Sequence, residues 1–334
     1  MKAVRLHGVG DMRVEEIAAP GDPGPGEVLV RVDAAGICGS DVHNFRTGMW
    51  ISRLPTVPGH EFCGTVVAAG PGSALREGQR VVADSRVSCG GCARCRAGRP
   101  HLCAAIGYVG EVCDGGFAGM VRLPAGQVLA LADVPVAAAA AAMAEPLAVA
   151  AHALNRLAPE TGMPVAIAGA GAIGALAALL LRQRGHGPVY IADRNRERLA
   201  LVTAATGAVA ADLADLAGAI GEAPAFAIEA TGSGAVADTL LAQLAPAARV
   251  ASVGIFHGRA SLDLNRIVEG EIDWLGCASF RTELAEVLPL LPALQQDMRA
   301  MASAPVPLDA VPDAYRALVD GTVATVKTIV VPQM

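Results

Sequence analysis

Three residues that can bind a metal stand in two short glycine-containing segments, residues 36–43 and 59–61. They are Cys38, His60 and Glu61. They offer a thiolate, an imidazole and a carboxylate, the ligand types that zinc accepts in catalytic sites with a position left for water or substrate. Each residue alone has a more ordinary interpretation, because a buried cysteine is usually a small core residue. Together, and beside the motifs described below, they predict a catalytic zinc site.

A hydroxyl and an imidazole follow two and five residues after the cysteine, at Ser40 and His43. If a metal-bound alcohol is oxidised, a proton must leave from this place, and these groups can carry it away. We therefore expect Ser40, His43 and Glu61 to be catalytic. A metal-bound histidine usually donates its other ring N–H to a carboxylate or carbonyl. Asp41 or Glu61 can play this part for His60, unless Asp41 only caps a turn or a helix start.

Four further cysteines have the spacing C-x2-C-x2-C-x7-C. Four thiolates so close in the chain can complete a tetrahedral zinc shell with no open position, which indicates a structural zinc. An iron–sulfur cluster is the main alternative, because cysteine ligation also suits it. A zinc ribbon that binds nucleic acid usually has two C-x2-C pairs separated by a longer insertion, which this group lacks. The predicted ligands are Cys89, Cys92, Cys95 and Cys103.

An alanine-rich run at residues 136–144 leads into Glu145 and Pro146. Alanine favours a helix, and Pro146 suits the first turn of one. Glu145 therefore stands at a predicted helix start, where its ordinary role is to compensate the helix dipole. Its more specific role is that of a further carboxylate near the catalytic zinc.

A glycine motif follows a predicted buried strand at residues 164–168 and opens a helical run at 175–184. Its pattern is G-x-G-x-x-G. The first glycine permits a tight turn, the second lets the backbone approach a pyrophosphate, and the third lets the helix pack on the strand. The predicted cofactor-binding residues of the motif are Gly169, Gly171, Ile173 and Gly174.

The next strand, residues 189–192, ends in Asp193, nineteen residues after the motif. An acid in this place can bind both ribose hydroxyls of an adenosine and would repel a 2′-phosphate, so we predict NAD in preference to NADP. Arg194, directly beside it, and Arg196 could soften this exclusion.

Two further predicted strands, residues 225–232 and 249–254, end in glycine. Ligands of a doubly wound sheet bind at the carboxyl ends of its strands. Thr231 and Gly254 are therefore candidates to line the nicotinamide, with the alternative that they are only turn residues.

The composition supports a folded protein of about two domains, since the chain has 334 residues, of which 53% are hydrophobic. A net charge of −6 without a basic block argues against nucleic acid as a partner. The start of the chain has no apolar signal segment, so we expect a cytoplasmic protein. Residues 161–181 carry no charge and have the length of a membrane span, but a buried parallel strand followed by a buried helix gives the same pattern. We expect no membrane contact.

The chain has two parts that differ in their pattern of apolar residues. Up to about residue 130, short apolar runs at 27–32, 64–68 and 80–82 are separated by glycine and proline clusters, which predicts a partly closed β-barrel with Cys38 on a loop at its edge. Later, strands alternate with helices, which predicts a doubly wound parallel sheet. Helix-like sequence at 284–299 and a last strand at 326–331 are expected to return to the first domain.

Taken together, these motifs resemble the zinc-dependent medium-chain dehydrogenase/reductase superfamily along nearly the whole chain. Cys-Gly-Ser-Asp-x-His is typical of its polyol and sugar dehydrogenases, of the sorbitol, L-idonate and galactitol-phosphate types. The resemblance implies an α/β protein with a GroES-like catalytic domain at 1–148 and 285–334, a structural zinc lobe at about 86–105, and a Rossmann dinucleotide-binding domain at 149–284. It also implies a homodimer or homotetramer.

The resemblance further implies two zinc ions per chain and NAD-dependent interconversion of a secondary alcohol of a polyol, sugar acid or sugar phosphate with its ketone. Cys38 and His60 are then zinc ligands, Glu61 binds or stands close behind, and Glu145 binds directly or through water. An L-threonine 3-dehydrogenase-like enzyme is the alternative. A non-catalytic nucleotide-binding protein on the same fold is the alternative of another class, and the joint presence of the metal-binding and proton-carrying residues argues against it.

Overall fold

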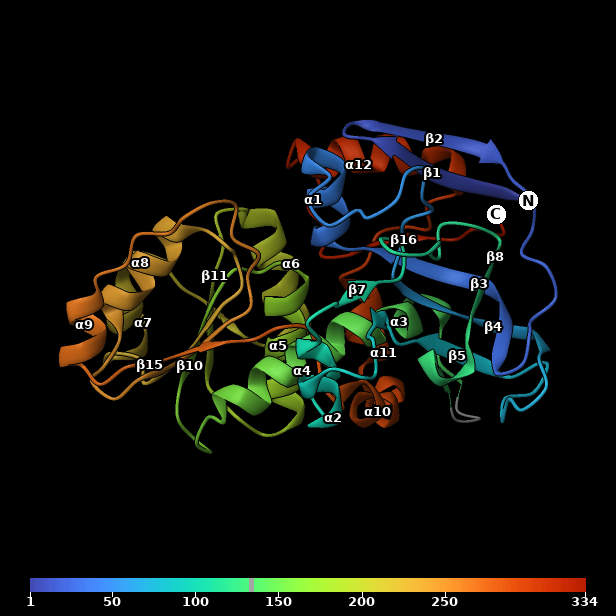
Figure 1. Cartoon of the computed structure of the whole chain (residues 1–334). Coiled ribbons are helices and arrows are strands. Elements are labelled where there is room, and N and C mark those ends of the chain that lie inside the picture. Colours follow the sequence, from blue (N-terminus) through green and yellow to red (C-terminus); the bar gives the residue numbers. More distant parts are fainter. Residues whose placement is uncertain (132–134) are drawn as a thin grey trace. The chain divides into compact units, whose positions relative to one another are not determined.

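The structure is a computed structural model that describes residues 1–131 and 135–334 (Figure 1). The chain forms two compact units. The first contains Met1–Glu145, Leu284–Val323 and Lys327–Met334, and the second contains Pro146–Glu283 and Ala324–Val326. The last part of the chain thus returns to the unit in which the chain begins.

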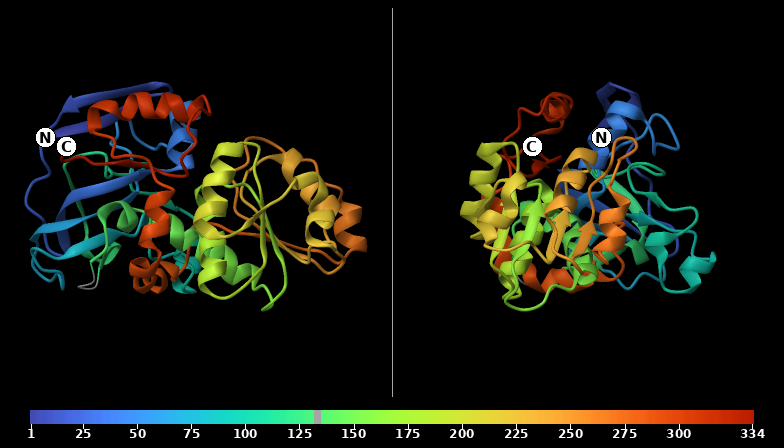
Figure 2. Two further views of the ribbon diagram at one scale, coloured as in Figure 1. Left: turned by 180° about the vertical axis from the view of Figure 1, so that it is seen from behind. Right: turned by 90° about the vertical axis from the view of Figure 1, so that its left-hand side faces the viewer.

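The first unit is built on a curled, antiparallel six-stranded sheet in the order β16-β3-β4-β5-β9, with β8 paired to β3 (Figures 1 and 2). A hairpin of β1 and β2 and a short pair of β6 and β7 accompany it. The strands are β1 (Lys2–Gly8), β2 (Asp11–Glu16), β3 (Glu27–Ile37), β4 (Glu61–Ala69), β5 (Arg80–Ala83), β6 (Arg86–Val87), β7 (Gly107–Tyr108), β8 (Met120–Pro124), β9 (Val128–Ala130) and β16 (Thr328–Val330). The helices are α1 (Gly39–Thr47), α2 (Ala93–Arg96), α3 (Ala138–Ala142), α11 (Leu291–Ala300) and α12 (Val311–Val319).

Strand β3 is longer than the predicted strand at 27–32, and the loop expected at Cys38 is a junction instead. The strand continues to Ile37 because its later residues are buried and pair with β4 and β16 on either side. Helix α1 begins at Gly39, so Cys38 is its N-cap residue. A residue at such a junction is fixed by both elements, whereas a residue on a loop is not.

The register of three neighbouring strands brings distant residues to one end of this sheet. Gly36 of β3 pairs with Glu61 of β4, and Ile37 pairs with Thr328 of β16. Lys327, which precedes Thr328, therefore lies at the same end of the sheet as Cys38. Segments almost 300 residues apart in sequence meet there.

The second unit contains a six-stranded parallel sheet in the order β12-β11-β10-β13-β14-β15. This is the predicted doubly wound sheet, and its strand order reverses between β10 and β13. Its strands are β10 (Val165–Ala168), β11 (Val189–Ala192), β12 (Val209–Ala210), β13 (Phe226–Glu229), β14 (Arg249–Ser252) and β15 (Asp273–Gly276). Its helices are α5 (Ala172–Gln183), α6 (Arg196–Thr206), α7 (Leu216–Ile220), α8 (Gly234–Gln243) and α9 (Leu264–Glu269).

The uncharged stretch at 161–181 is explained by β10 and α5, both of which are largely buried. Across the described residues, none of the helices combines the length and the apolar character that crossing a bilayer requires. Helix α4 (Ala144–Leu157) begins at the predicted position, with Glu145 in its first turn.

The helix-like sequence at 284–299 is not one helix. It forms α10 (Glu283–Val287), a 3-10 turn (Leu288–Leu290) and α11. Pro289 and Pro292 are the second residues of the two later elements. Proline lacks the N–H that a continuous helix needs, so it favours a new start at each of these positions.

The glycine motif lets α5 lie directly on the end of β10. Gly169 has φ of 106°, which favours glycine, and a Cβ on Gly174 would fall on the Gly169 carbonyl oxygen. At Gly171, by contrast, a Cβ would meet nothing within 4 Å. Two glycines of the motif are therefore required by packing, and the middle one leaves free space at the start of the helix.

A buried carboxylate in the second unit is held by hydrogen bonds. His152 Nδ1 lies 2.9 Å from Glu283 Oε1, and the amide groups of Arg281 and Thr282 donate to Oε2 at 2.6 and 3.0 Å. Burial raises the pKa of Glu283, but the hydrogen bonds from His152 and the backbone outweigh burial and lower it to about 2.

We expect Gly174→Ala to destabilise the second unit by about 1–3 kcal/mol, because the added methyl group overlaps with backbone that cannot move away easily. The matched control is Gly171→Ala, which should leave the unfolding midpoint nearly unchanged. Urea unfolding of both variants followed by circular dichroism measures this. Equal stability of the two variants would contradict the packing described here.

We expect Glu283→Gln to lower the free energy of unfolding at pH 7 by about 1–2 kcal/mol after allowance for solvent screening. The folded pKa lies below the unfolded value of about 4.3. The contribution of Glu283 is therefore present above pH 4.3 and is lost as the pH falls towards 2. Urea unfolding at pH 7 and at pH 3 should show a smaller difference at pH 3, with the exposed Glu160→Gln as control. An identical difference at both pH values would rule out this linkage.

Candidate active site and metal centres

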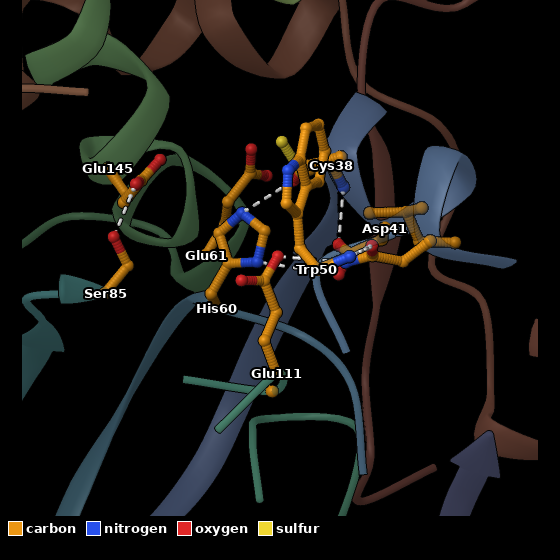
Figure 3. A network of polar contacts seen from close by, with 12 residues as sticks. Cys38, Asp41, Trp50, His60, Glu61, Ser85, Glu111 and Glu145 are labelled. Carbon is orange, nitrogen blue, oxygen red and sulfur yellow. Dashed lines mark hydrogen bonds and ion pairs between the residues drawn. The ribbon is translucent and has the colours of Figure 1, made fainter. Parts of the chain in front are cut away.

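The three predicted ligands of the catalytic zinc come together in the first unit. One donor atom from each of Cys38, His60 and Glu61 lies within 4.8 Å of the others. Cys38 follows β3, whereas His60 precedes β4 and Glu61 begins it (Figure 3). The close approach needs a glycine at position 36, because a Cβ there would fall on Glu61 Oε2.

These donors fit a zinc ion. Zinc–ligand bonds of 2.0–2.3 Å at tetrahedral angles separate neighbouring donors by about 3.3–3.8 Å, which the group can reach with small side-chain shifts. Burial disfavours the charged form of His60, but the negative charges of Asp41 and Cys38 outweigh burial and raise the pKa of His60 well above its usual value. The surroundings therefore favour a positive charge at this point.

Asp41 supports two members of the group. Its Oδ2 accepts a hydrogen bond of 2.9 Å from the backbone N–H of Cys38, and its Oδ1 lies 3.5 Å from His60 Nδ1. Asp41 therefore combines the two predicted roles, because its carboxylate caps the start of α1 and also faces the imidazole of His60. His60 Nε2 is left on the side of the ring that faces Ser40.

The two predicted proton carriers both lie on α1. Ser40 Oγ is 3.4 Å from His60 Nε2, so the hydroxyl adjoins the metal-binding group. His43 is buried one turn later, and its ring centroid lies 4.6 Å from that of Trp50. The structure therefore places Ser40 at the ligands and His43 beside an aromatic side chain.

A lysine that the sequence analysis did not single out holds Glu61. Lys327 Nζ lies 2.7 Å from both Glu61 carboxylate oxygens and donates to the carbonyl of Ile37 at 3.2 Å. The two side chains are 2% and 1% exposed. Burial opposes the charge on Lys327, but the Glu61 carboxylate outweighs burial and raises the lysine pKa. The sequence did offer one signal for a buried, paired lysine, because Lys327 is the only charged residue in the otherwise largely apolar segment 323–331.

Glu145 lies near this group but is not one of its three members. Its Oε1 accepts a hydrogen bond of 2.7 Å from Ser85 Oγ, and the residue is buried (Figure 3). Burial raises the pKa of Glu145 to about 7. The structure thus offers Glu61 to a metal within the group and Glu145 beside it.

The four clustered cysteines form a second metal-binding group within 4.8 Å. Their sulfur separations include 3.4 Å for Cys89 and Cys103, 3.6 Å for Cys92 and Cys95, and 4.0 Å for Cys92 and Cys103. Four thiolates around one zinc would be separated by about 3.8 Å. Backbone amides also point at the sulfurs, and they lower the pKa of Cys92 to about 6. This group therefore fits a closed structural zinc site.

Asp193 in the second unit joins the glycine motif to the helix that follows. Its carboxylate accepts hydrogen bonds from the amides of Ala170 at 2.8 Å and Asn195 at 2.7 Å. Arg198 Nη2 lies 2.9 and 3.2 Å from the two carboxylate oxygens. Arg194 is exposed. Arg198 was not predicted, although its place one turn after Asp193 was a usable signal.

The other predicted cofactor residues lie at the carboxyl ends of the central strands. Thr231 donates to Glu229 Oε1 from both its amide and its hydroxyl, and a Cβ on Gly254 would fall on the amide of Gly232. Ile173 lies in the first turn of α5 and is partly buried. These contacts fit tight turns, so the roles of these residues toward a cofactor stay predictions.

Comparison with known proteins adds independent findings. Residues 24–133 match the family described as alcohol dehydrogenase GroES-like domain, and residues 172–293 match the zinc-binding dehydrogenase family. The chain is similar to an L-threonine 3-dehydrogenase of Streptomyces avermitilis, with 36% identity over 279 residues that cover 78% of this chain and 81% of the relative.

Two solved structures resemble the whole chain. The 2R,3R-butanediol dehydrogenase from Bacillus subtilis has a TM-score of 0.90 and 28% identity, with 99% of each chain covered. A zinc-binding dehydrogenase from Sinorhizobium meliloti, solved with bound NADP, has a TM-score of 0.90 and 30% identity, again with 99% of each chain covered.

We expect Lys327→Met to lower the free energy of unfolding of the first unit by about 3–5 kcal/mol, because it leaves the Glu61 charge buried and unpaired. The matched control is Lys2→Met, which removes an exposed lysine from its pair with Asp309 and should change the stability very little, because solvent screens an exposed pair. Denaturant unfolding measures both effects.

Adding Glu61→Gln to Lys327→Met should restore part of the lost stability, since it removes the unpaired charge. Equal effects of Lys327→Met and Lys2→Met would show that the buried pair does not have the role described.

Proposed function

Since this chain belongs to the zinc-dependent medium-chain dehydrogenase family, whose members are oxidoreductases acting on CH–OH groups, we propose that it interconverts a secondary alcohol and its ketone with NAD as the hydride carrier. The observation that carries the proposal is the meeting of a thiol, an imidazole and a carboxylate within 4.8 Å, with the hydroxyl of Ser40 3.4 Å from the imidazole.

Cys38 and His60 would hold the catalytic zinc, with Glu61 or Glu145 as the carboxylate ligand. A bound zinc ion lowers the pKa of an alcohol hydroxyl so that it can lose its proton near neutral pH. The second zinc would be held by Cys89, Cys92, Cys95 and Cys103, where it stabilises the lobe and leaves no position for substrate.

The residues of α1 would position the alcohol and remove its proton. The Ser40 hydroxyl lies 3.4 Å from the metal-binding imidazole, so it is placed to accept the proton first. His43 lies further along the same helix and can receive a proton in turn. Asp41 keeps His60 in place through its contacts with the ring and with the Cys38 amide.

Asp193 supports NAD as the cofactor. Its carboxylate lies at the end of β11, directly beside the glycine motif, where a 2′-phosphate would meet its negative charge. Arg198 binds the same carboxylate, and Arg194 is exposed. The Sinorhizobium meliloti relative was solved with NADP, so a direct comparison of the two cofactors belongs to the test.

The substrate proposed from the sequence is a polyol, sugar acid or sugar phosphate, with an amino-acid alcohol such as L-threonine as the second candidate. The names of the relatives support both classes, since one is a butanediol dehydrogenase and another is an L-threonine 3-dehydrogenase. Phe45 packs in the core against Tyr315, so it is not available to a substrate. Trp50 is partly exposed, and we propose it as a residue that contacts the substrate.

The test is reduction of NAD⁺ and of NADP⁺ by zinc-loaded protein with a panel of polyols, sugar acids, sugar phosphates and L-threonine. We expect turnover with one class and with NAD⁺. Ser40→Ala should lower kcat by about 100-fold or more without loss of zinc, because it removes the first proton acceptor. Ser40→Thr keeps the hydroxyl and should retain much more activity.

Zinc-loaded protein that binds NAD⁺ but reduces it with no alcohol of the panel would contradict the proposed activity and favour the non-catalytic alternative. Equal activity of Ser40→Ala and wild-type protein would contradict the role of Ser40 alone.

A further inference from the structure

Glu111 is an acid beside the candidate catalytic site that the proposed chemistry does not use. It follows β7 in a turn whose backbone lies directly on the segment before His60, because a Cβ on Gly110 would be 2.9 Å from the amide nitrogen of Gly59. The residues that follow, Glu111 and His60, therefore emerge side by side. Figure 3 shows the Glu111 side chain directed from this turn toward His60.

Glu111 has less direct charge compensation than Glu61, since the positive charge that acts on it is that of the His60 imidazole. The residue is 5% exposed, and its carboxylate accepts one hydrogen bond of 2.9 Å from the neutral amide of Asn44. Within the described parts of the chain, no lysine or arginine pairs with it. Glu61, by contrast, is fully paired with Lys327. A buried carboxylate without a direct ion pair is costly, so a cationic ligand in hydrogen-bond contact would stabilise it.

The electrostatic surroundings of Glu111 also favour a positively charged ligand. The pKa of Glu111 is raised to about 7, chiefly by burial and also by the charge of Asp41, whereas His60 and the hydrogen bond from Asn44 act to lower it. Asp41, Glu111 and Glu145 are three buried acids around one imidazole. A phosphate or carboxylate on the substrate would be repelled here, while a positive group would be attracted.

The amide of Asn44 links the Glu111 carboxylate to the backbone of Trp50. Asn44 donates to Glu111 Oε1 and accepts a hydrogen bond of 3.1 Å from the backbone N–H of Trp50. The Trp50 side chain is 38% exposed and packs against the ring of His43. The protein thus ties a carboxylate and the backbone of a tryptophan to one side chain, and carboxylates and indole rings are groups that proteins use to bind an ammonium.

We propose that Glu111, with Trp50, binds the protonated amine of a vicinal amino-alcohol substrate. This inference rests on the proposed alcohol oxidation, because the catalytic site places the carbinol at Cys38 and His60. Glu111 then selects the ammonium over a neutral hydroxyl at the neighbouring carbon. Asn44 is a positioning residue, since it fixes both Glu111 and the Trp50 backbone.

The test compares two small alcohols that differ in one group, 1-amino-2-propanol and 1,2-propanediol, at neutral pH, where the amine is protonated. Their binding to zinc-loaded protein in the presence of NAD⁺ is measured by calorimetry, so the result does not depend on turnover. Wild-type protein should bind the amine at least about 10-fold more tightly than the diol, because a hydrogen bond to a charged group is stronger than one to a neutral group.

Glu111→Gln should abolish this preference and leave diol binding unchanged. Glutamine keeps an acceptor for Asn44, so the turn should stay folded, which thermal unfolding checks. Glu77→Gln removes an exposed charge and serves as the control for a general electrostatic effect.

An equal affinity of the wild-type protein for amine and diol would overturn the proposal. So would an equal loss of affinity for both ligands in Glu111→Gln, because that result would make Glu111 a support for His60. Failure of the proposed dehydrogenase activity is seen separately, as the absence of NADH formation with any alcohol, and it leaves the calorimetric comparison intact.

Discussion

The compensation of buried negative charge is the constraint on which the candidate active site depends. Cys38, Asp41, Glu61 and Glu145 all lie around His60, and burial penalises each uncompensated charge. Lys327 balances one of them through a pair with Glu61 that is almost fully hidden from solvent. The remaining charge favours a metal ion among the donors, which is the condition that a zinc site requires. The proposed binding of a positive substrate group rests on a separate buried carboxylate, that of Glu111.

The sheet of the first unit creates this constraint. Strand β3 ends where its two neighbours, β4 and β16, begin. This register puts Lys327, Cys38 and Glu61 together. Gly36 leaves room for the Glu61 carboxylate, and Gly110 lets the Glu111 turn lie on the backbone before His60. Charged groups thus meet because glycines allow the backbones beside them to approach closely.

Much of this arrangement was predictable from the sequence, because it rests on residue types at fixed spacings. The four-cysteine spacing allows few geometries, and the glycine motif between strand and helix predicted a doubly wound sheet, which the structure has. Cys38 and His60 were predicted as ligands because zinc accepts few donor types, and the structure brings their donor atoms together. The helix break at Pro289 and Pro292 was not predicted, although the two prolines were visible in the helix-like sequence at 284–299.

The contacts that were missed depend on tertiary structure. Glu111 is a single acid in a glycine-containing turn, and only the packing of Gly110 on Gly59 brings it to the site. Lys327 meets Glu61 across 266 residues of sequence, through a register that no local pattern encodes. Ser85 likewise finds Glu145 only because β5 and the start of α4 are close in the folded unit. Such pairings follow from the fold and not from any motif.

The central claim is that Cys38 and His60 hold a zinc ion distinct from the one in the four-cysteine lobe. The most direct measurement is the zinc content of wild-type protein, Cys38→Ser and Cys95→Ser by mass spectrometry of the metal, on folded protein in each case. The account predicts about two zinc ions per chain in wild-type protein and about one in each variant, with alcohol oxidation lost in Cys38→Ser. A Cys38→Ser protein that keeps as much zinc as wild-type protein would contradict it.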